Sequence, residues 1–379
     1  MTPSLLAWAV ERSRLEQAQI AAAFPRFADW LDDQARPTIS ELEKFAKLTR
    51  TPLGYLFLEE PPEESVPIRD FRTWGNLGVE RPSPDLLDTL YDCQMRQAWY
   101  HDHALAMGFE SLKFVGSVTA GTSPDAVAAA IRQALGLDSR ERARWNQPAN
   151  AWRWLVDAAE SLGVLVMVSG VVGLNTHRKL DPGEFRGFAL VDPLAPVIFV
   201  NGADSKPSKA PHVFTLIHEL AHIWAGDSGV SGTDFSTRHG DADEVWANRV
   251  AAEVLVPASE LTATWSDASA TELQRLRKIF CVSTLAILNQ ALDCGLLSWD
   301  VYQRTYASEW SRVAGALQTA EATGGGNFHH TQPYRVSKRF AKALVSDTLE
   351  GRTLYTDSYA LLGVRKHSVF ERFAETVMA

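Results

Sequence analysis

The sequence has few cysteines, no long hydrophobic run and no excess of positive charge. Its three cysteines are scattered and odd in number, which excludes a cysteine-cluster metal site and is typical of proteins in the reducing cytoplasm. No apolar run reaches membrane-spanning length, and the first residues, which include acids, do not resemble a secretion signal. A net charge of -9 argues against a protein that mainly coats nucleic acid or an anionic membrane. We therefore expect a cytoplasmic protein without membrane contact, in which histidines and carboxylates hold any metal.

The remaining composition predicts a folded chain with several domains. A length of 379 residues exceeds one ordinary core, and 46% hydrophobic against 22% charged residues supplies enough apolar material for more than one. Two breaks are indicated by EEPPEESVP at 59–67 and GGGN at 324–327. We expect five parts: a helical unit at 1–60, a helical connector at 61–110, a central domain at 111–265, a helical extension at 266–323 and a small basic helical tail at 324–379.

The pattern of apolar residues predicts an α+β fold with a small sheet. In the first part, short helical periodicities cover 4–12, 15–23, 26–34, 38–48 and 52–57, and Thr38 with Glu41 forms a capping box that predicts a helix from Ile39. Helical patterns return at 83–136 and 150–162, with Ser123 or Asp125 as a cap. Three segments rich in β-branched residues follow and are predicted as strands of one sheet: 163–170, 185–192 and 195–202.

The stretch VFTLIHELAHIWAG at 213–226 places polar residues in a helix that is otherwise apolar. Because residues four apart share one helix face, His218 and His222 can converge on one ion, while Glu219 points about a quarter-turn away. Two imidazoles and a third ligand suit zinc, which leaves a position for a water molecule and lowers its pKa, with Glu219 as the general base. Such a match also arises by chance in about one or two chains per hundred, but unpaired His and Glu would be costly in a buried helix.

A third ligand is predicted on the later helix DADEVWANRVAAEVLVP. Glu244 lies 22 residues beyond His222, and Asn248 follows one turn later, where it can orient a ligating imidazole. Two other carboxylates compete for the ligand role. Asp241 lies one turn earlier, and Glu253 faces the opposite side of the helix. We favour Glu244.

These two helices resemble the ImmA/IrrE family of zinc metallopeptidases. The likeness includes HVFTLIHELAHIWAG, EVWANRVAAEVLVP, the strand pair FRGFALVDPLAPVIFVNGADS and the junction VPIRDFRT at 66–73, and it extends over most of residues 1–300. The resemblance implies a zincin-like domain of the thermolysin type, with Zn²⁺ held by His218, His222 and Glu244 and with Glu219 as the catalytic base. It also implies a regulatory role, because members of this family cleave or inactivate helix-turn-helix repressors.

The remaining features of the predicted site are open. His212 or His239 could stabilise an oxyanion, although each could equally be a surface or capping residue. The strand at 185–191 could pair with an extended substrate at a sheet edge, or it could be an internal strand.

The flanking parts suggest contacts with other macromolecules. Residues 1–60 resemble an XRE-type helix-turn-helix, but they contain seven Lys/Arg against nine Asp/Glu, and acids occupy the segment of the recognition helix. We therefore favour protein contact or self-association over DNA binding for this part. Residues 327–379 contain eight Lys/Arg against five Asp/Glu and could bind DNA or present a solvated face.

Two functions follow from these observations. The first is a zinc-dependent endopeptidase that acts on a protein target such as a repressor or a toxin. The second is an antitoxin-like or transcription-regulating protein that uses the peptidase fold as a scaffold, because long chains resembling this one are encoded beside a PIN-like ribonuclease toxin.

Overall fold

The computed structural model describes residues 2–70, 81–118, 122–203, 208–232, 241–319 and 328–378. The chain divides into two compact units, an N-terminal unit of Met1–Pro67 with Gly78–Tyr91 and a main unit of Ile68–Leu77 with Asp92–Ala379. Each unit has its own hydrophobic core. The expected hinge at 324–327 and part of the 66–73 junction lie outside the described residues, and the five-part division stays a prediction.

The N-terminal unit is helical, as its apolar periodicity predicts. The capping box is confirmed, because the Thr38 hydroxyl accepts from the Glu41 amide and the Glu41 carboxylate accepts from the Thr38 amide. Phe24, Phe27 and Phe45 pack with a tryptophan at the centre of the core. The elements of the unit before the linker are α1 Pro3–Ser13, α2 Gln17–Ala23, α3 Phe27–Leu31, α4 Ile39–Thr49 and the 3₁₀ helix η1 Leu53–Phe57.

The main unit contains a five-stranded mixed sheet in the order β1-β5-β3-β4-β2. β4 runs parallel to β2, whereas β3 runs antiparallel to both β4 and β5. The three predicted strands are confirmed, and β1 and β5 extend the sheet beyond them. The strands are β1 Arg69–Asp70, β2 Leu165–Ser169, β3 Gly187–Leu190, β4 Val197–Asn201 and β5 Gly229–Ser231.

Fourteen helices of the described residues surround this sheet or continue beyond it, with α5 also extending into the N-terminal unit. The predicted Ser123 cap of α6 is confirmed, since its hydroxyl accepts from the Ala126 amide. The bounds of these helices are α5 Pro84–Ala106, α6 Pro124–Leu135, α7 Ser139–Ala143, α8 Pro148–Ser161, α9 Ala210–Ala225, α10 Ala242–Leu255, α11 Ala258–Thr264, α12 Ala270–Phe280, α13 Thr284–Asp293, α14 Trp299–Thr319, α15 Phe328–Arg335, α16 Lys338–Leu349, α17 Tyr355–Leu362 and α18 His367–Met378.

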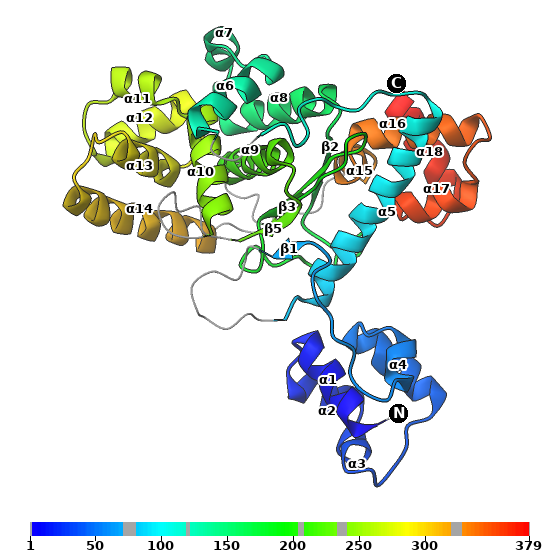
Figure 1. The fold of residues 1–379 in the computed structure, drawn as a ribbon. Helices are drawn as coiled ribbons and strands as arrows, with labels where there is room; N and C mark the ends of the chain where they lie inside the picture. Colours follow the sequence, from blue (N-terminus) through cyan, green and yellow to red (C-terminus); the bar gives the residue numbers. More distant parts are fainter. Residues whose placement is uncertain are drawn as a thin grey trace. The chain divides into compact units, whose positions relative to one another are not determined.

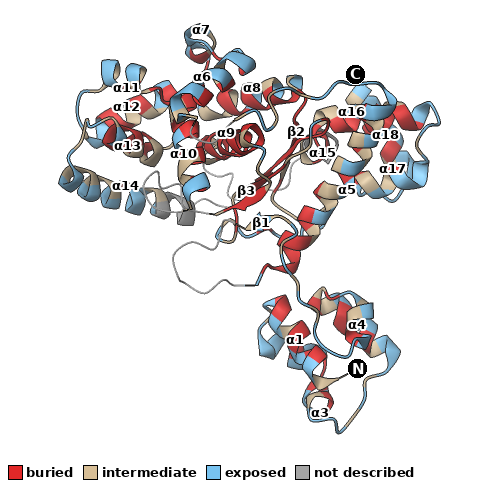
Figure 2. Ribbon diagram, viewed as in Figure 1, coloured by how far each residue is buried: buried red, intermediate tan, exposed pale blue. Residues whose placement is uncertain are grey.

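Helix α9 is the central element of the main unit. It packs against β3 and β4 of the sheet and against α8 and α10 on its other sides (Figure 1). Nearly all of its residues are buried, as are those of the central strands (Figure 2). An apolar helix covered on all sides by neighbours is expected for a core element. Its polar residues are therefore enclosed by the fold.

Of the two alternatives for the strand at 185–191, the structure shows the internal strand. β3 lies between β4 and β5, so its backbone already pairs on both sides. The three-residue β5 has too short a pattern to be recognised in the sequence, which is why the sequence alone does not choose between an edge strand and an internal strand. In the part of the chain that the structure describes, no helix combines the length and the hydrophobicity needed to cross a membrane.

Candidate metal centre

Helix α9 brings the two histidines to one face and places them beside the sheet. It carries Pro211 in its first turn and ends at Gly226, which adopts the left-handed conformation with φ 77°. A side chain at Gly226 would also meet the backbone of Gly116 at 2.9 Å, so this position requires glycine for two reasons. His218 and His222 lie one turn apart between these ends, and both are fully or almost fully buried.

Helix α10 supplies a carboxylate to the same point. Asp241 is its N-cap, with the side chain accepting from the Asp243 amide, and Glu244 follows in the first turn. α10 packs directly against α9, which brings Glu244 to the two histidines across 22 residues of sequence. Glu244 is 8% exposed, an uncommon degree of burial for a carboxylate without a compensating charge.

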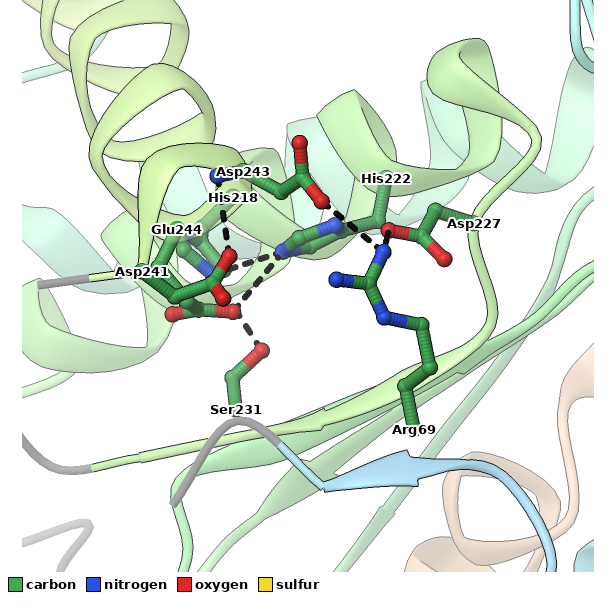
Figure 3. Close-up of polar contacts among 8 residues, drawn as sticks. All are labelled: Arg69, His218, His222, Asp227, Ser231, Asp241, Asp243 and Glu244. Atoms are coloured by element: carbon green, nitrogen blue, oxygen red, sulfur yellow. Dashed lines mark hydrogen bonds and ion pairs between the residues drawn. The ribbon is translucent and has the colours of Figure 1, made fainter. Parts of the chain in front are cut away.

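His218, His222 and Glu244 direct their polar atoms at one another (Figure 3). The two Nε2 atoms are 3.2 Å apart. Glu244 Oε1 lies 3.1 Å from His222 Nε2, and Glu244 Oε2 lies 3.3 Å from His218 Nε2. Within the described residues, this is the one group of three or more His, Cys, Asp or Glu side chains with the spacing to hold a metal ion.

The spacing and chemistry of these three residues fit a zinc ion. Tetrahedral zinc with ligand distances of about 2.0–2.1 Å separates its donor atoms by about 3.3–3.4 Å, close to the separations seen here. Two imidazole nitrogens and one carboxylate are also a ligand set that zinc prefers. In addition, Glu244 and Glu219 bring two buried carboxylates together, whose charges a dication would neutralise.

Glu219 lies between the site and the sheet, next to Gly187 of β3. It is fully buried, and neither of its carboxylate oxygens has a hydrogen bond of standard geometry. A methyl group added at Gly187 of β3 would approach Glu219 Oε1 at 2.8 Å, which shows how closely the carboxylate meets the strand. A buried carboxylate of this kind is costly to keep, because burial without hydrogen bonds disfavours its charge.

Burial and the neighbouring charges shift the pKa values in the site. Burial raises the pKa of Glu219 to about 8, with Glu244 adding to the shift and His218 opposing it. Burial opposes ionisation of Glu244, but the two imidazoles outweigh it and hold its pKa well below the usual range. Burial also lowers the pKa of His222, whereas at His218 the carboxylates outweigh burial and raise the pKa. Without metal, the site therefore favours one protonated imidazole, a charge that a bound cation would replace.

Asn248 lies on α10 one turn after Glu244, as the sequence predicts for a neighbour that orients an imidazole. It is 1% exposed and interacts with His218, and this contact favours the protonated form of that ring. A buried amide that holds one ring nitrogen helps to fix the orientation of the other nitrogen. The structure thus brings together all five residues expected at the site.

The two competing carboxylates of α10 have other partners. Glu253 accepts from the Ala258 amide and from Gln290 Nε2 at 2.9 Å, so it satisfies the first amide of α11 and contacts α13. Asp241 is occupied as the N-cap of α10. Neither belongs to the group of converging donor atoms.

The two histidines expected as oxyanion stabilisers do not join the site. His212 packs edge-on against Trp152 of α8, with Lys209 Nζ at 3.5 Å. Burial, with added repulsion from nearby cations, lowers the pKa of His212 to about 3, so the ring is neutral. His239 lies outside the described residues. The oxyanion-stabilising residue therefore stays unassigned.

Sequence reasoning missed two features beside the cluster. Ser231 of β5 places its hydroxyl 3.2 Å from His218 Nε2. Arg69 of β1 bridges two helices, with Nη1 2.7 Å from Asp227, after α9, and 2.8 Å from Asp243, in α10 (Figure 3). Both strands are too short to show an alternating pattern, and the partners of Arg69 are 158 and 174 residues away in the sequence, so no local signal indicates either feature.

Comparison with known families supports the resemblance to ImmA/IrrE-type peptidases over the centre of the chain. Residues 159–291 match the M78 peptidase model described as an IrrE N-terminal-like domain. The match includes β2 to β5, α9 and α10, and therefore every residue of the converging cluster. Residues 336–376 match a domain of unknown function (DUF8813). No curated protein matches the chain significantly.

Proposed function

We propose that this protein is a zinc-dependent endopeptidase of the ImmA/IrrE type, with a thermolysin-like site that cleaves a regulatory protein such as a repressor or a toxin. The observation that carries the proposal is the convergence of three buried side chains, whose donor atoms lie 3.1–3.3 Å apart, beside a buried glutamate without standard hydrogen bonds. The match of residues 159–291 to a peptidase family supports the same conclusion.

Each residue of the cluster has a distinct task in this proposal. His218, His222 and Glu244 hold the ion, and Asn248 keeps the His218 ring in the ligating orientation. A zinc ion in such a site acidifies water and polarises a carbonyl group. Glu219 accepts the proton of the attacking water on its carboxylate and later donates it to the leaving amine. The raised pKa of Glu219, about 8 without metal because of burial, supports this role, since a more basic carboxylate is a better proton acceptor.

The direct test is cleavage by zinc-loaded wild type and by the Glu219→Gln variant. Glutamine keeps the size of the side chain but cannot accept the proton, so we expect activity to fall by about 10²–10⁴-fold while zinc content is unchanged. Glu253→Gln is the matched control, because it changes a glutamate outside the cluster and should retain activity. The Glu219→Gln protein also serves as a trap for uncleaved substrate in pull-down experiments.

A second candidate is a regulatory protein that binds a toxin or DNA through the same scaffold without cleaving it. The acidic surface of the N-terminal unit favours protein contact, because Asp32 and Asp33 are exposed at the end of α3, the position of the expected recognition helix. This candidate predicts that the Glu219→Gln variant still neutralises a PIN-like ribonuclease partner. Loss of all biological activity in that variant would favour the peptidase.

A further inference from the structure

Strand β5 covers the site from the side of the sheet. It pairs with β3 in antiparallel register, with Gly187 opposite Ser231, and both residues face α9. Antiparallel partners lie on the same face of a sheet, so the Ser231 side chain emerges where Glu219 meets Gly187. Ser231 is 1% exposed, which means that the site is closed to solvent at this point.

The hydroxyl of Ser231 lies directly beside the three converging residues. Its Oγ lies 3.2 Å from His218 Nε2, the same separation as that between the two histidine nitrogens. It also interacts with Glu219, although neither Glu219 oxygen has a hydrogen bond of standard geometry. A water deprotonated by Glu219 would have to stand between the ligands and Glu219, and the Ser231 hydroxyl, which interacts with both His218 and Glu219, borders that region. Figure 3 shows Ser231 beside His218 and Glu244.

β5 is itself held in place by β1. β1 pairs with its outer edge in parallel register, Arg69 opposite Gly229 and Asp70 opposite Val230. Arg69 joins β1 to both metal-centre helices through Asp227 and Asp243. β5 is therefore enclosed between β3 and a strand that is tied to α9 and α10. The outer edge of β3, where an extended peptide could pair, is occupied by the chain itself.

We propose that Ser231 is a fourth protein donor of the metal centre and that its hydroxyl closes the centre until β5 leaves β3. The proposal rests on the proposed zinc site. Zinc sites with four protein donors are closed, whereas catalytic sites keep one position free. A neutral hydroxyl is a weak donor compared with imidazole or thiolate, so this closure is reversible. Displacement of β5 would free both the fourth position and the edge of β3.

The test measures access to the metal directly. In cobalt-substituted protein, whose visible spectrum reports coordination, acetohydroxamate is titrated as a small chelating probe. We expect Ser231→Ala to bind the probe about tenfold more tightly than wild type or better, the scale of one interaction with a charged group. Ser169→Ala, which removes a buried hydroxyl of β2 outside the cluster, is the control and should match wild type.

A second variant tests the position of Ser231 without opening the site. Ser231→Cys places a thiolate at the position of the Ser231 hydroxyl. We expect a near-ultraviolet charge-transfer band with cobalt, together with weaker probe binding than in wild type. Equal probe affinity in wild type and Ser231→Ala, with no thiolate band in Ser231→Cys, would overturn the inference. If wild type took up no cobalt at all, the metal centre would be overturned as well, so the two failures are distinguishable.

Discussion

Two buried glutamates in the main unit differ in the hydrogen bonds that the fold provides to their carboxylates. Glu160, near the end of α8, accepts hydrogen bonds from the Ser337 hydroxyl at 2.6 Å and the Lys338 amide at 2.9 Å, and so joins α8 to the start of α16. Glu219 is buried more deeply but has no hydrogen bond of standard geometry. Burial raises the pKa of both, so the shift alone does not separate them.

The hydrogen-bond partners distinguish the surroundings of Glu160 from those of Glu219. At Glu160 the fold satisfies the carboxylate, which indicates that stability is its role. At Glu219 the fold accepts the cost of an unsatisfied carboxylate next to three converging donor atoms, which is the pattern expected of a functional site. Five substitutions test this difference between the two glutamates and their surroundings.

The largest expected effect comes from the two glutamates themselves. Glu160→Ala leaves the Ser337 hydroxyl and the Lys338 amide without their acceptor, so we expect a loss of about 2–5 kcal/mol in the free energy of unfolding. Glu219→Gln should have the opposite sign in metal-free protein at neutral to alkaline pH, because glutamine is neutral and needs neither proton uptake on folding nor burial of a charge. Urea unfolding of both variants checks this, and destabilisation by Glu219→Gln would contradict the assignment of roles.

The raised pKa of Glu219 predicts that the free energy of unfolding depends on pH. The folded-state pKa of Glu219, about 8, lies above its ordinary value of 4.5, so its contribution to stability is full below about pH 4.5 and is lost as the pH rises to 8. The slope is about 1.4 kcal/mol per pH unit in metal-free protein. Unfolding measured between about pH 5 and pH 8 should show this slope in wild type, and Glu219→Gln should lack it.

The second effect concerns the contact between Glu219 and the sheet. Gly187→Ala would place a methyl group 2.8 Å from Glu219 Oε1, the Phe199 carbonyl oxygen and a Thr215 methyl group. We expect a destabilisation of about 1–3 kcal/mol and a displaced Glu219, with loss of cleavage but retention of zinc. Gly54→Ala, where an added Cβ meets no atom within 4 Å, is the control. Full activity in Gly187→Ala would show that the position of Glu219 does not matter.

A smaller effect, on zinc affinity, is expected from substitution of Asn248, which contacts the ligand His218. Asn248→Ala should weaken zinc binding about 10–100-fold, because His218 loses the contact that orients its ring. Competition with a chromophoric chelator measures the affinity. An unchanged dissociation constant would show that Asn248 only fills space in the core. The residues needed at the zinc site would then be the three ligands and Glu219.

The smallest effect on stability should come from Arg69. Its side chain is 51% exposed, so Arg69→Ala should cost less than about 1 kcal/mol and leave zinc content unchanged. Hydrogen exchange at Val230 and Ser231 should nevertheless become faster, because β1 loses its tie to α9 and α10. Unchanged exchange would show that β1 does not hold β5 in place.

The sequence predicts those parts of the molecule that depend on local pattern. The capping box at Thr38, the three longer strands and the His218–His222 pair all follow from periodicity or fixed spacing, and helix phase is enough to prefer Glu244 over Glu253. Contacts between distant segments have no such signal. The Ser337–Glu160 contact joins residues 177 apart, and nothing in either local stretch indicates it.

Short strands explain why the sequence leaves the position of β3 in the sheet open. β1 and β5 contain two and three residues, and their pairing, β5 with β3 and β1 with β5, is defined by tertiary contact and not by alternation. For this reason the sequence does not distinguish an edge strand from an internal strand at 185–191, whereas the structure shows β3 paired on both sides. The position of Ser231 in the metal centre depends on the same pairing and could not be foreseen.

Metal content measured by elemental analysis decides whether His218, His222 and Glu244 form a zinc site. The wild-type protein and the Glu253→Gln control should each retain about one zinc per chain after dialysis, whereas His218→Ala and Glu244→Ala should retain none although they remain folded. A well-folded wild type that contains no zinc and does not bind it when zinc is added, or a Glu244→Ala variant that keeps wild-type zinc, would contradict this account.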